Sequence, residues 1–367
     1  MERPWYHSVD WLLAATCVAI SLLGVLMIRS ADLHDPGAGS EWTKQLAYVA
    51  VGVGLLAIFA AIPYQKWQRW ARLLYVVNFL LLAGVLAAGH ASHGAVRWIS
   101  LGPLGTFQPS EPAKLILGIT GASLLARAKT VGPREMLLTI VAVMVPALLI
   151  LKQPDFGTML VVFAIVTCQL FFAVEKMRHF AVYAVLTTAV AAFTLGTKFV
   201  LKPFQRDRLL VFLHPNRDLE GIGYNLHQSK IAIGSGALFG KGLFKGTQTQ
   251  LQFVPEHSRD FIFTVLGEEF GYIGAVSLVV LYGVVLARAM RAVLSARDRF
   301  GLLLGAGIAA MLAVHIVVNV GMTIGIMPVT GIPLPFMSYG GSAILTDFIA
   351  IGILLNISYQ HDQLVFV

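Results

Sequence analysis

The sequence predicts an all-α integral membrane protein of about ten transmembrane helices, which form one polytopic domain over residues 1–367. Hydrophobic residues make up 57% of the chain and charged residues 13%, which is about half the charged share of an average soluble domain. The apolar residues also fall into uncharged blocks of about 18–25 residues, the helical length that crosses a hydrocarbon core of about 30 Å. Neither feature suits a single aqueous globule.

The breaks between the uncharged blocks give the order of the spans. The first block is longer than the core of a signal peptide and has no A-x-A cleavage pattern, so we expect it to be retained. We expect spans near residues 10–30, 43–62, 72–89, 109–128, 133–151, 156–174, 178–200, 261–288, 301–326 and 340–359.

The charges between the spans predict the orientation of the chain. Basic residues gather in the short loops after the second, fourth, sixth and eighth spans, as they do in cytoplasmic loops, so both termini are expected in the cytoplasm. The net charge of +8 is scattered over loops and forms no single basic face, so no nucleic-acid partner is expected. The basic loop residues are Lys66, Arg69, Arg72, Arg127, Lys129, Arg134, Lys176, Arg178, Arg288, Arg291, Arg297 and Arg299.

Residues 201–260 form a polar, glycine-rich segment, which this topology makes a large extracytoplasmic loop between the seventh and eighth spans. Long loops can cross a membrane regardless of their charge. The segment keeps enough apolar residues to fold against the membrane domain and not remain disordered. These residues are Phe204, Leu209, Leu210, Phe212, Tyr224, Ile231, Ile233, Leu243, Phe244 and Phe253.

Several kinds of site are missing from the sequence. Cys17 and Cys168 both lie inside expected spans, so no disulfide framework is expected in the loops. The sequence has no H-E-x-x-H motif, Cys/His cluster, EF-hand spacing or G-x-S-x-G elbow. Any chemistry must therefore come from carboxylates and cations, without an organic cofactor.

Glu111 and Lys114 are charged residues at the start of the fourth expected span, three positions apart and so on one helical face. Charges near or inside a membrane are costly unless they are paired or face water. They form either a self-contained structural ion pair or one wall of a polar cavity. Pro109 and Pro112 favour the cavity, because they suit a helix that begins beside one.

Two outer turns carry further candidate residues. Asp155, in the turn between the fifth and sixth spans, is either a helix N-cap or part of a site. The run from Pro328 through Pro335 to Ser338 is too irregular to cross lipid alone, and such backbone is tolerated only in protein or beside a cavity. We therefore expect a re-entrant segment that lines the cavity.

The long loop contains a glycine-rich run, residues 234–242, that looks like a phosphate cradle. A P-loop needs Gly where Ser235 stands and Ser or Thr where Gly242 stands, so the nucleotide-binding interpretation fails. The basic residues of the loop either bind an anionic lipid head group or form a solvated surface. They are Arg206, Arg208, Lys230, Lys241 and Lys245.

Asp260 ends the long loop, immediately before the apolar start of the eighth span, with Glu256, His257 and Arg259 as its neighbours. A carboxylate at this boundary either caps the helix or acts as a general base on a hydroxyl of a lipid-anchored substrate. Glu268 and Glu269 lie two turns further along, and at least one of them must face protein or water.

The assembled motifs resemble the shape, elongation, division and sporulation (SEDS) family over nearly the whole chain. The motifs are long, and they occur in the family's order. They are Arg97-Trp98, QPSEPAK at 108–114, QPDFGT at 153–158, FQRDR at 204–208, QSKIAIGSGALFGKG at 228–242, GTQTQLQFVPE at 246–256, DFIF at 260–263 and GIPLPFMSYGGS at 331–342.

The resemblance implies a peptidoglycan glycosyltransferase that polymerises lipid II on the outer face of the bacterial cytoplasmic membrane, during cell-wall elongation and maintenance of rod shape, and releases undecaprenyl diphosphate. It also implies two kinds of partner: a class B penicillin-binding protein with transpeptidase activity, and other membrane proteins of the elongation machinery. The family's essential aspartate matches Asp260, and its Glu and Lys at the fourth span match Glu111 and Lys114. The family commonly has His-Thr before the aspartate, where this chain has His257-Ser-Arg, and the adjacent arginine favours the ionised carboxylate and so a weaker base.

On this interpretation a sugar hydroxyl of one lipid-linked disaccharide attacks the anomeric carbon of the other chain, and the diphosphate lipid leaves. Asp260 removes the hydroxyl proton, while cations, among them a divalent Mg²⁺ or Mn²⁺, offset charge on the diphosphate. The residues expected to bind substrate are Glu111, Lys114, Arg206, Arg208, Lys230, Lys241 and Ser338.

Two other functions use the same features. A lipid II flippase or transporter would use the cavity with Glu111 as a coupling site, and a non-catalytic scaffold of the elongation machinery would need only packing surfaces. The long outer loop favours the enzyme, because a transporter has no need of acidic and basic groups gathered on one aqueous side.

Overall fold

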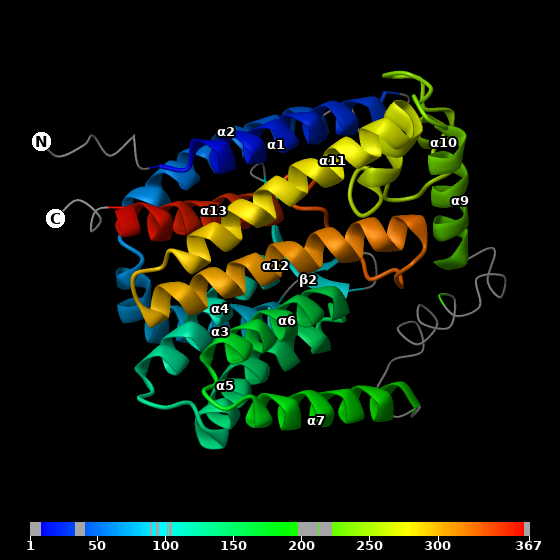
Figure 1. Cartoon of the computed structure of the whole chain (residues 1–367). Helices are drawn as coiled ribbons and strands as arrows, with labels where there is room; N and C mark the ends of the chain where they lie inside the picture. The colour runs from blue at the N-terminus through cyan, green and yellow to red at the C-terminus, as the bar shows by residue number, and fades with distance from the viewer. Residues whose placement is uncertain are drawn as a thin grey trace, which may run out of the picture.

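The computed structural model describes residues 9–33, 41–88, 90–92, 95–100, 102, 105–196, 212 and 222–362. These residues form twelve helices and three short strands, labelled as in Figure 1. The helices are α1 (Trp11–Ala31), α2 (Glu41–Ala61), α3 (Gln65–Ala88), α4 (Ser110–Arg127), α5 (Pro133–Lys152), α6 (Phe156–Ala173), α7 (Met177–Gly196), α9 (Ile222–Ser235), α10 (Thr247–Gln250), α11 (Ile262–Leu294), α12 (Arg299–Ile324) and α13 (Gly341–Asp362). The strands are β1 (His90–Ser92), β2 (Ala95–Ser100) and β3 (Thr106–Phe107).

The long helices α1 to α7 and α11 to α13 lie where the ten spans are expected. Among the described residues, eight helices are long and apolar enough to cross a membrane, and α4 and α7 are not among them. Helix α4 carries Glu111, Lys114 and Arg127 within its 18 residues. The all-α membrane fold is thus confirmed, while the number of spans stays a prediction.

Two helices extend beyond the expected spans. Helix α3 begins at Gln65 and not at residue 72, and α11 continues to Leu294, past residue 288. Both extensions carry basic residues, at which an uncharged-block criterion stops. The helical backbone continues through them because long basic side chains reach the membrane surface from the ends of a span.

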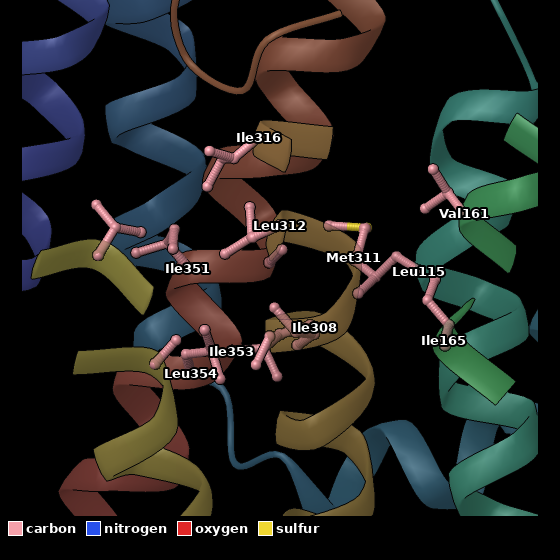
Figure 2. Close-up of a cluster of buried hydrophobic side chains, with 14 of the residues drawn as sticks. Leu115, Val161, Ile165, Ile308, Met311, Leu312, Ile316, Ile351, Ile353 and Leu354 are labelled. Carbon is pink, nitrogen blue, oxygen red and sulfur yellow. The ribbon is translucent and has the colours of Figure 1, made fainter. Parts of the chain in front are cut away.

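Helices α12 and α13 form the centre of the bundle. Helix α12 packs against α4, α6, α11 and α13, and α13 packs closely against α2. Figure 2 shows Met311 facing Leu115 of α4 and Ile165 of α6, while Leu312 lies near Ile351 of α13. Because lipid chains are as apolar as these side chains, close packing and hydrogen bonds hold the helices together, with little hydrophobic driving force.

A small antiparallel sheet, in the order β1-β2-β3, lies between α3 and α4. The sequence gives no sign of this sheet. Strand pairing joins His90 to Trp98 and Ile99 to Phe107. Strands of two to six residues carry too little alternation to be recognised, yet β2 holds Arg97 and Trp98 beside the cavity described below.

The described part of the long loop, residues 222–260, folds against the membrane domain as expected. Its anchors agree only in part with the expected ones. Ile233 packs against the main hydrophobic core as expected, whereas Ile231, Leu243 and Phe253 are exposed. Leu226, Ala232 and Val254 are buried instead, in a cluster with side chains of the α12 end and the start of α11. Phe204, Leu209 and Leu210 lie outside the described residues.

The glycine-rich run 234–242 packs directly against the backbone of α11, where Gly271 (φ 63°) breaks the helical geometry. Lys241 N–H donates to the carbonyl of Glu268 (3.0 Å), and Tyr272 N–H donates to the carbonyl of Ala237 (2.9 Å). A Cβ added to Gly240 would lie 2.0 Å from the carbonyl oxygen of Glu269. Glycine therefore serves a close backbone approach here, and the run satisfies peptide groups that the kink leaves unpaired.

Glu268 and Glu269 both face protein and are almost fully buried. The Glu268 carboxylate accepts hydrogen bonds from Lys241 Nζ (2.6 Å) and from the backbone of Gln248 (2.8 Å) and Thr249 (3.0 Å). Glu269 Oε1 accepts one from the hydroxyl of Ser30 in α1. The two carboxylates thus tie the outer loop and α1 to the start of α11.

Candidate active site

A cavity of about 290 Å³ opens among the starts of α4, α6, α11 and α13 and the end of α12. These helix ends lie opposite the end of the bundle that carries the chain termini (Figure 1). The cavity brings together Glu111, Lys114, Asp155 and Asp260, four of the charged residues that the sequence singles out. It is lined by Arg97, Trp98, Gln108, Glu111, Lys114, Asp155, Thr158, Glu256, Arg259, Asp260, His315, Gly331, Ile332, Pro333, Tyr339, Gly340, Ser342 and Ala343.

Lys114 lies at the inner wall of the cavity between two partners. Its Nζ is 2.8 Å from Glu111 Oε2 and 3.1 Å from His315 Nε2. An ammonium only donates, so His315 accepts through Nε2 and carries its ring proton on Nδ1. Glu111 and Lys114 therefore form an ion pair and also line the cavity, so both interpretations considered for these two residues apply.

His315 is not among the residues expected from the sequence, although its position gives a signal. It is a histidine near the middle of α12, and an ionisable residue inside a span is by itself a candidate functional group. What the sequence does not give is its partner, since His315 and Lys114 are 201 residues apart.

Asp155 has both roles considered for it. Its Oδ1 accepts a hydrogen bond from Thr158 N–H (3.1 Å), which caps α6. Its Oδ2 accepts from Ser110 Oγ (3.0 Å) and Gln108 Nε2 (3.1 Å), which joins α6 to the start of α4 across the cavity wall. Arg97 supports the same turn, because its Nε donates to the carbonyl of Gln153 (2.7 Å).

Asp260 lines the cavity from the last turn before α11. Asn319 Nδ2 of α12 donates to the Asp260 carbonyl (2.9 Å) and to the Ile332 carbonyl (2.7 Å), so one amide fixes both cavity walls. The N-cap position of α11 is occupied by Phe261 and not by Asp260. This position favours a role for Asp260 in the cavity over a simple helix cap.

The arginine beside Asp260 has other carboxylates near it. Arg259 lies 3.6 Å from Glu256 and 4.0 Å from Glu41, and its guanidinium is 5.8 Å from the ring of Tyr339. Burial, and then the charge of Glu41, raise the pKa of Tyr339 to about 12, so its hydroxyl stays neutral at physiological pH. Among the described residues, the Arg259 guanidinium thus forms ion pairs with Glu41 and Glu256.

Ser338 does not line the cavity but holds its rim in place. Its Oγ donates to the carbonyl of Arg259 (2.6 Å) and accepts from Leu334 N–H (2.8 Å). Gln45 of α2 donates to the Ser338 carbonyl (3.0 Å). The residue expected to bind substrate is therefore placed to position the Arg259–Asp260 turn, and the segment 331–340 lines the cavity as expected.

Of the loop residues expected to bind substrate, Lys230 and Lys241 are not brought to the cavity. Lys241 pairs with the buried Glu268, and Lys230 lies over Gly325, the C-cap of α12, where a cation is favourable. Neither is among the cavity-lining residues. Arg206 and Arg208 lie outside the described residues.

The donor set of the cavity does not fit a protein-held metal ion. Within the described ranges no group of three or more His, Cys, Asp or Glu side chains could hold one. Glu111 is paired with Lys114, and Asp155 already accepts several hydrogen bonds. A divalent cation bound together with a substrate diphosphate stays a prediction.

The fold and this cavity define a class: multi-pass helical membrane proteins that keep charged side chains around an open polar cavity at one end of the bundle. The family described as cell cycle protein (FTSW_RODA_SPOVE) matches residues 10–363. The chain belongs to this family, the one that the sequence motifs indicate.

Three similar proteins show how far the likeness extends. Peptidoglycan glycosyltransferase MrdB of Escherichia coli K12 is 38% identical over 351 residues, covering 95% of this chain and 92% of that protein. The crystal structure of the rod shape determining protein RodA of Thermus thermophilus has a TM-score of 0.70 and 30% identity, covering 97% and 98% of the two chains. A chain of a peptidoglycan synthase complex, described as coordinating polymerization and crosslinking, has a TM-score of 0.80 and 32% identity, covering 97% and 99%.

Proposed function

We propose that this chain is a peptidoglycan glycosyltransferase and that the cavity around Asp260 is its active site. The E. coli relative, at 38% identity, bears that enzyme name. The observation that carries the site is that a carboxylate, Asp260, and a buried ammonium, Lys114, line the same cavity. Glycosyl transfer from a diphosphate needs one group that takes a proton and one that offsets the charge of the leaving group.

The proposed substrate is lipid II, and the reaction joins two lipid-linked sugar chains. A sugar hydroxyl oxygen of the acceptor forms a bond to the anomeric carbon of the donor. The bond between that carbon and the diphosphate oxygen breaks, and undecaprenyl diphosphate leaves. Asp260 accepts the hydroxyl proton as the new bond forms.

Lys114 is suited to the leaving group. An ammonium has three N–H donors, and Glu111 and His315 take two of them, which leaves one for a diphosphate oxygen. Because both partners fix its position before substrate arrives, little reorganisation is needed as charge develops. We propose that Arg206 and Arg208 act on the same diphosphate from the outer loop.

The size of the cavity limits what it encloses. At about 290 Å³ it lies at the lower end of small-molecule pockets, so it takes only the reacting sugar and diphosphate ends. The lipid tails and the remaining glycan must lie outside. This is the arrangement required of a polymerase whose substrates stay anchored in the membrane while the product grows away from it.

The test is glycan synthesis from lipid II by purified protein reconstituted with its partner. Asp260→Asn keeps the size of the side chain but removes the base, and positioned bases contribute about 10²–10⁴ in rate. Asp298→Asn is the matched control, because Asp298 caps α12 at the other end of the bundle and Asn also caps well. We expect no polymer from a folded Asp260→Asn variant and normal polymer from Asp298→Asn.

Near-normal polymerisation by Asp260→Asn would exclude Asp260 as the base. The same preparation separates the other two functions. Lipid II crossing vesicle membranes without polymer formation would indicate a flippase. A wild-type protein that makes no polymer but assembles with the elongation proteins would indicate a scaffold.

We further propose that both termini are cytoplasmic and that the cavity opens on the outer face of the bacterial cytoplasmic membrane. We also propose that the partners are a class B penicillin-binding protein and other elongation proteins. A related chain comes from a complex that combines polymerization with crosslinking, which supports a transpeptidase partner. Thr247 is exposed in the long loop, at the cavity end of the bundle. In a background without Cys17 and Cys168, Thr247→Cys should react with an impermeant thiol reagent added to spheroplasts; reaction only after permeabilisation would reverse the topology.

A further inference from the structure

The turn at residues 237–239 presents apolar side chains away from the protein. Leu238 is 57% exposed and Phe239 is 79% exposed, the largest exposure among the large hydrophobic side chains of the described residues. The sequence from Ile231 to Gly240 contains no charged residue. Two adjacent exposed apolar side chains in a loop otherwise held by buried carboxylates make this turn a candidate contact surface.

The height of this turn along α11 is fixed by backbone hydrogen bonds. Tyr272 N–H donates to the carbonyl of Ala237 (2.9 Å), and Ile273 N–H donates to the carbonyl of Leu238 (3.2 Å). The turn therefore lies beside the first residues after the kink at Gly271. Figure 1 shows the segment between α9 and α10 lying around this end of α11.

Exposure along α11 changes at the same level. From Ile262 to Glu269 the helix is buried under the loop and neighbouring helices. From Tyr272, which is 65% exposed, large apolar side chains such as Ile273 and Val280 face outward. In a membrane-spanning helix such a face contacts lipid, and Tyr is enriched where the hydrocarbon meets the head groups.

The length of α11 places this level at a membrane boundary. Arg288 pairs with Asp10 (2.6 Å) near the start of α1, at the end of the bundle that carries the termini. Tyr272 precedes Arg288 by 16 positions, which is roughly 24 Å at 1.5 Å per residue. A hydrocarbon core is about 30 Å thick, so Tyr272 and the adjacent turn lie close to the opposite boundary, and residues 261–271, which the sequence assigns to this span, lie at the outer edge of the membrane.

We propose that the turn 237–239 is a membrane anchor, in which Leu238 and Phe239 insert among lipid acyl chains beside Tyr272. The lipid is favoured over a protein partner because the exposed turn continues the lipid-facing surface of α11. Two side chains also cover far less than the about 1,000 Å² that a specific protein interface buries.

The anchor has a mechanical consequence for the long loop. Residues 240–260 lead from the turn to the cavity, so an anchored turn fixes where this segment begins relative to the lipid head groups. A substrate with a lipid tail presents its head group at that level. The anchor itself rests on the membrane position of α11 and not on the proposed catalytic reaction.

Spin labelling tests the anchor in the full chain. Phe239→Cys, in a background with Cys17→Ala and Cys168→Ala, is labelled with a nitroxide and reconstituted into vesicles of phosphatidylethanolamine and phosphatidylglycerol. Collisions with O₂, which concentrates in acyl chains, are compared with collisions with a water-soluble nickel chelate. Val276→Cys on α11 is the lipid control, and Lys245→Cys, at an exposed basic position of the same loop, is the aqueous control.

We expect the O₂-to-nickel ratio at residue 239 to match that at 276, at a depth of about 5–10 Å below the head groups, as for interfacial segments. A ratio like that at residue 245 would overturn the proposal, because the turn would then be in water. Protection from both reagents would also overturn it, since protein would then cover the turn. Leu238→Cys provides a second labelled position, and neither side chain is needed for packing.

Discussion

Removing one member of the buried Glu111–Lys114 pair should cost more than removing both. The side chains are 6% and 1% exposed, and their charged atoms are 2.8 Å apart. Loss of one partner from a buried pair leaves an uncompensated charge and typically costs about 3–5 kcal/mol. In Glu111→Gln the Lys114 ammonium keeps its hydrogen bond to His315, so we expect a loss of stability near the lower end of this range. In Lys114→Met the Glu111 carboxylate loses its ammonium partner, so we expect a loss near the upper end.

The double variant Glu111→Gln/Lys114→Met carries neither charge, and should be more stable than Lys114→Met alone. The measurement is a double-mutant cycle on the free energy of unfolding in mixed micelles, titrated with a denaturing detergent. The control is the Arg259–Glu256 pair, whose side chains are each 41% exposed; its coupling should be at most about 1 kcal/mol and should fall with salt. Additive losses at Glu111 and Lys114, or a coupling as small as that of the control, would refute the reasoning.

Two further predictions concern the packing of the long loop on α11. Gly240→Ala should destabilise this packing by about 2–4 kcal/mol, because the added Cβ would lie 2.0 Å from a carbonyl oxygen and the backbone φ is +79°. The control is Gly234→Ala, which should be neutral or slightly stabilising because no atom lies within 4 Å of the added Cβ. Proteolysis of the loop and thermal unfolding would show the difference, and equal behaviour would contradict the close approach. Glu268→Gln should lower the free energy of unfolding by about 1–3 kcal/mol, because charge-assisted hydrogen bonds to Lys241 and the loop backbone are lost. The same substitution at the exposed Glu175 should change the free energy of unfolding by at most about 0.5 kcal/mol. A loss no larger than at Glu175 would mean that the carboxylate does not hold the loop.

The positions of the long helices follow from the sequence because the membrane sets the length of each apolar block. Where a charge interrupts a helix without ending it, as before residue 72, the boundary is wrong although the helix is right. The short sheet is missed for the opposite reason. Its strands are stabilised by pairing with each other, and nothing in a run of six residues reveals the partner.

The charged residues of the candidate site can be predicted from the sequence, but the contacts between them cannot. Charged residues at helix starts, such as Glu111, Lys114 and Asp260, are conspicuous because a membrane makes them costly. Contacts between distant segments are not, so neither the bond from His315 to Lys114 nor that from Asn319 to Asp260 could be predicted. Basic loop residues are ambiguous for the same reason: Lys230 and Lys241 have the right charge for a diphosphate, but the fold uses them elsewhere.

The backbone contact between residues 236–242 and the kink at Gly271 has a consequence for biogenesis. Peptide groups near that kink bond to the loop and not within α11, and each would be costly if left unpaired at the membrane boundary. Residues 236–242 are synthesised before residues 267–273, so they are already present when the kinked segment reaches the membrane. The preceding turn therefore supplies bonding partners to this end of α11 as it folds. Deleting that turn should disturb the helical segment before the kink and not the insertion of the apolar residues that follow it.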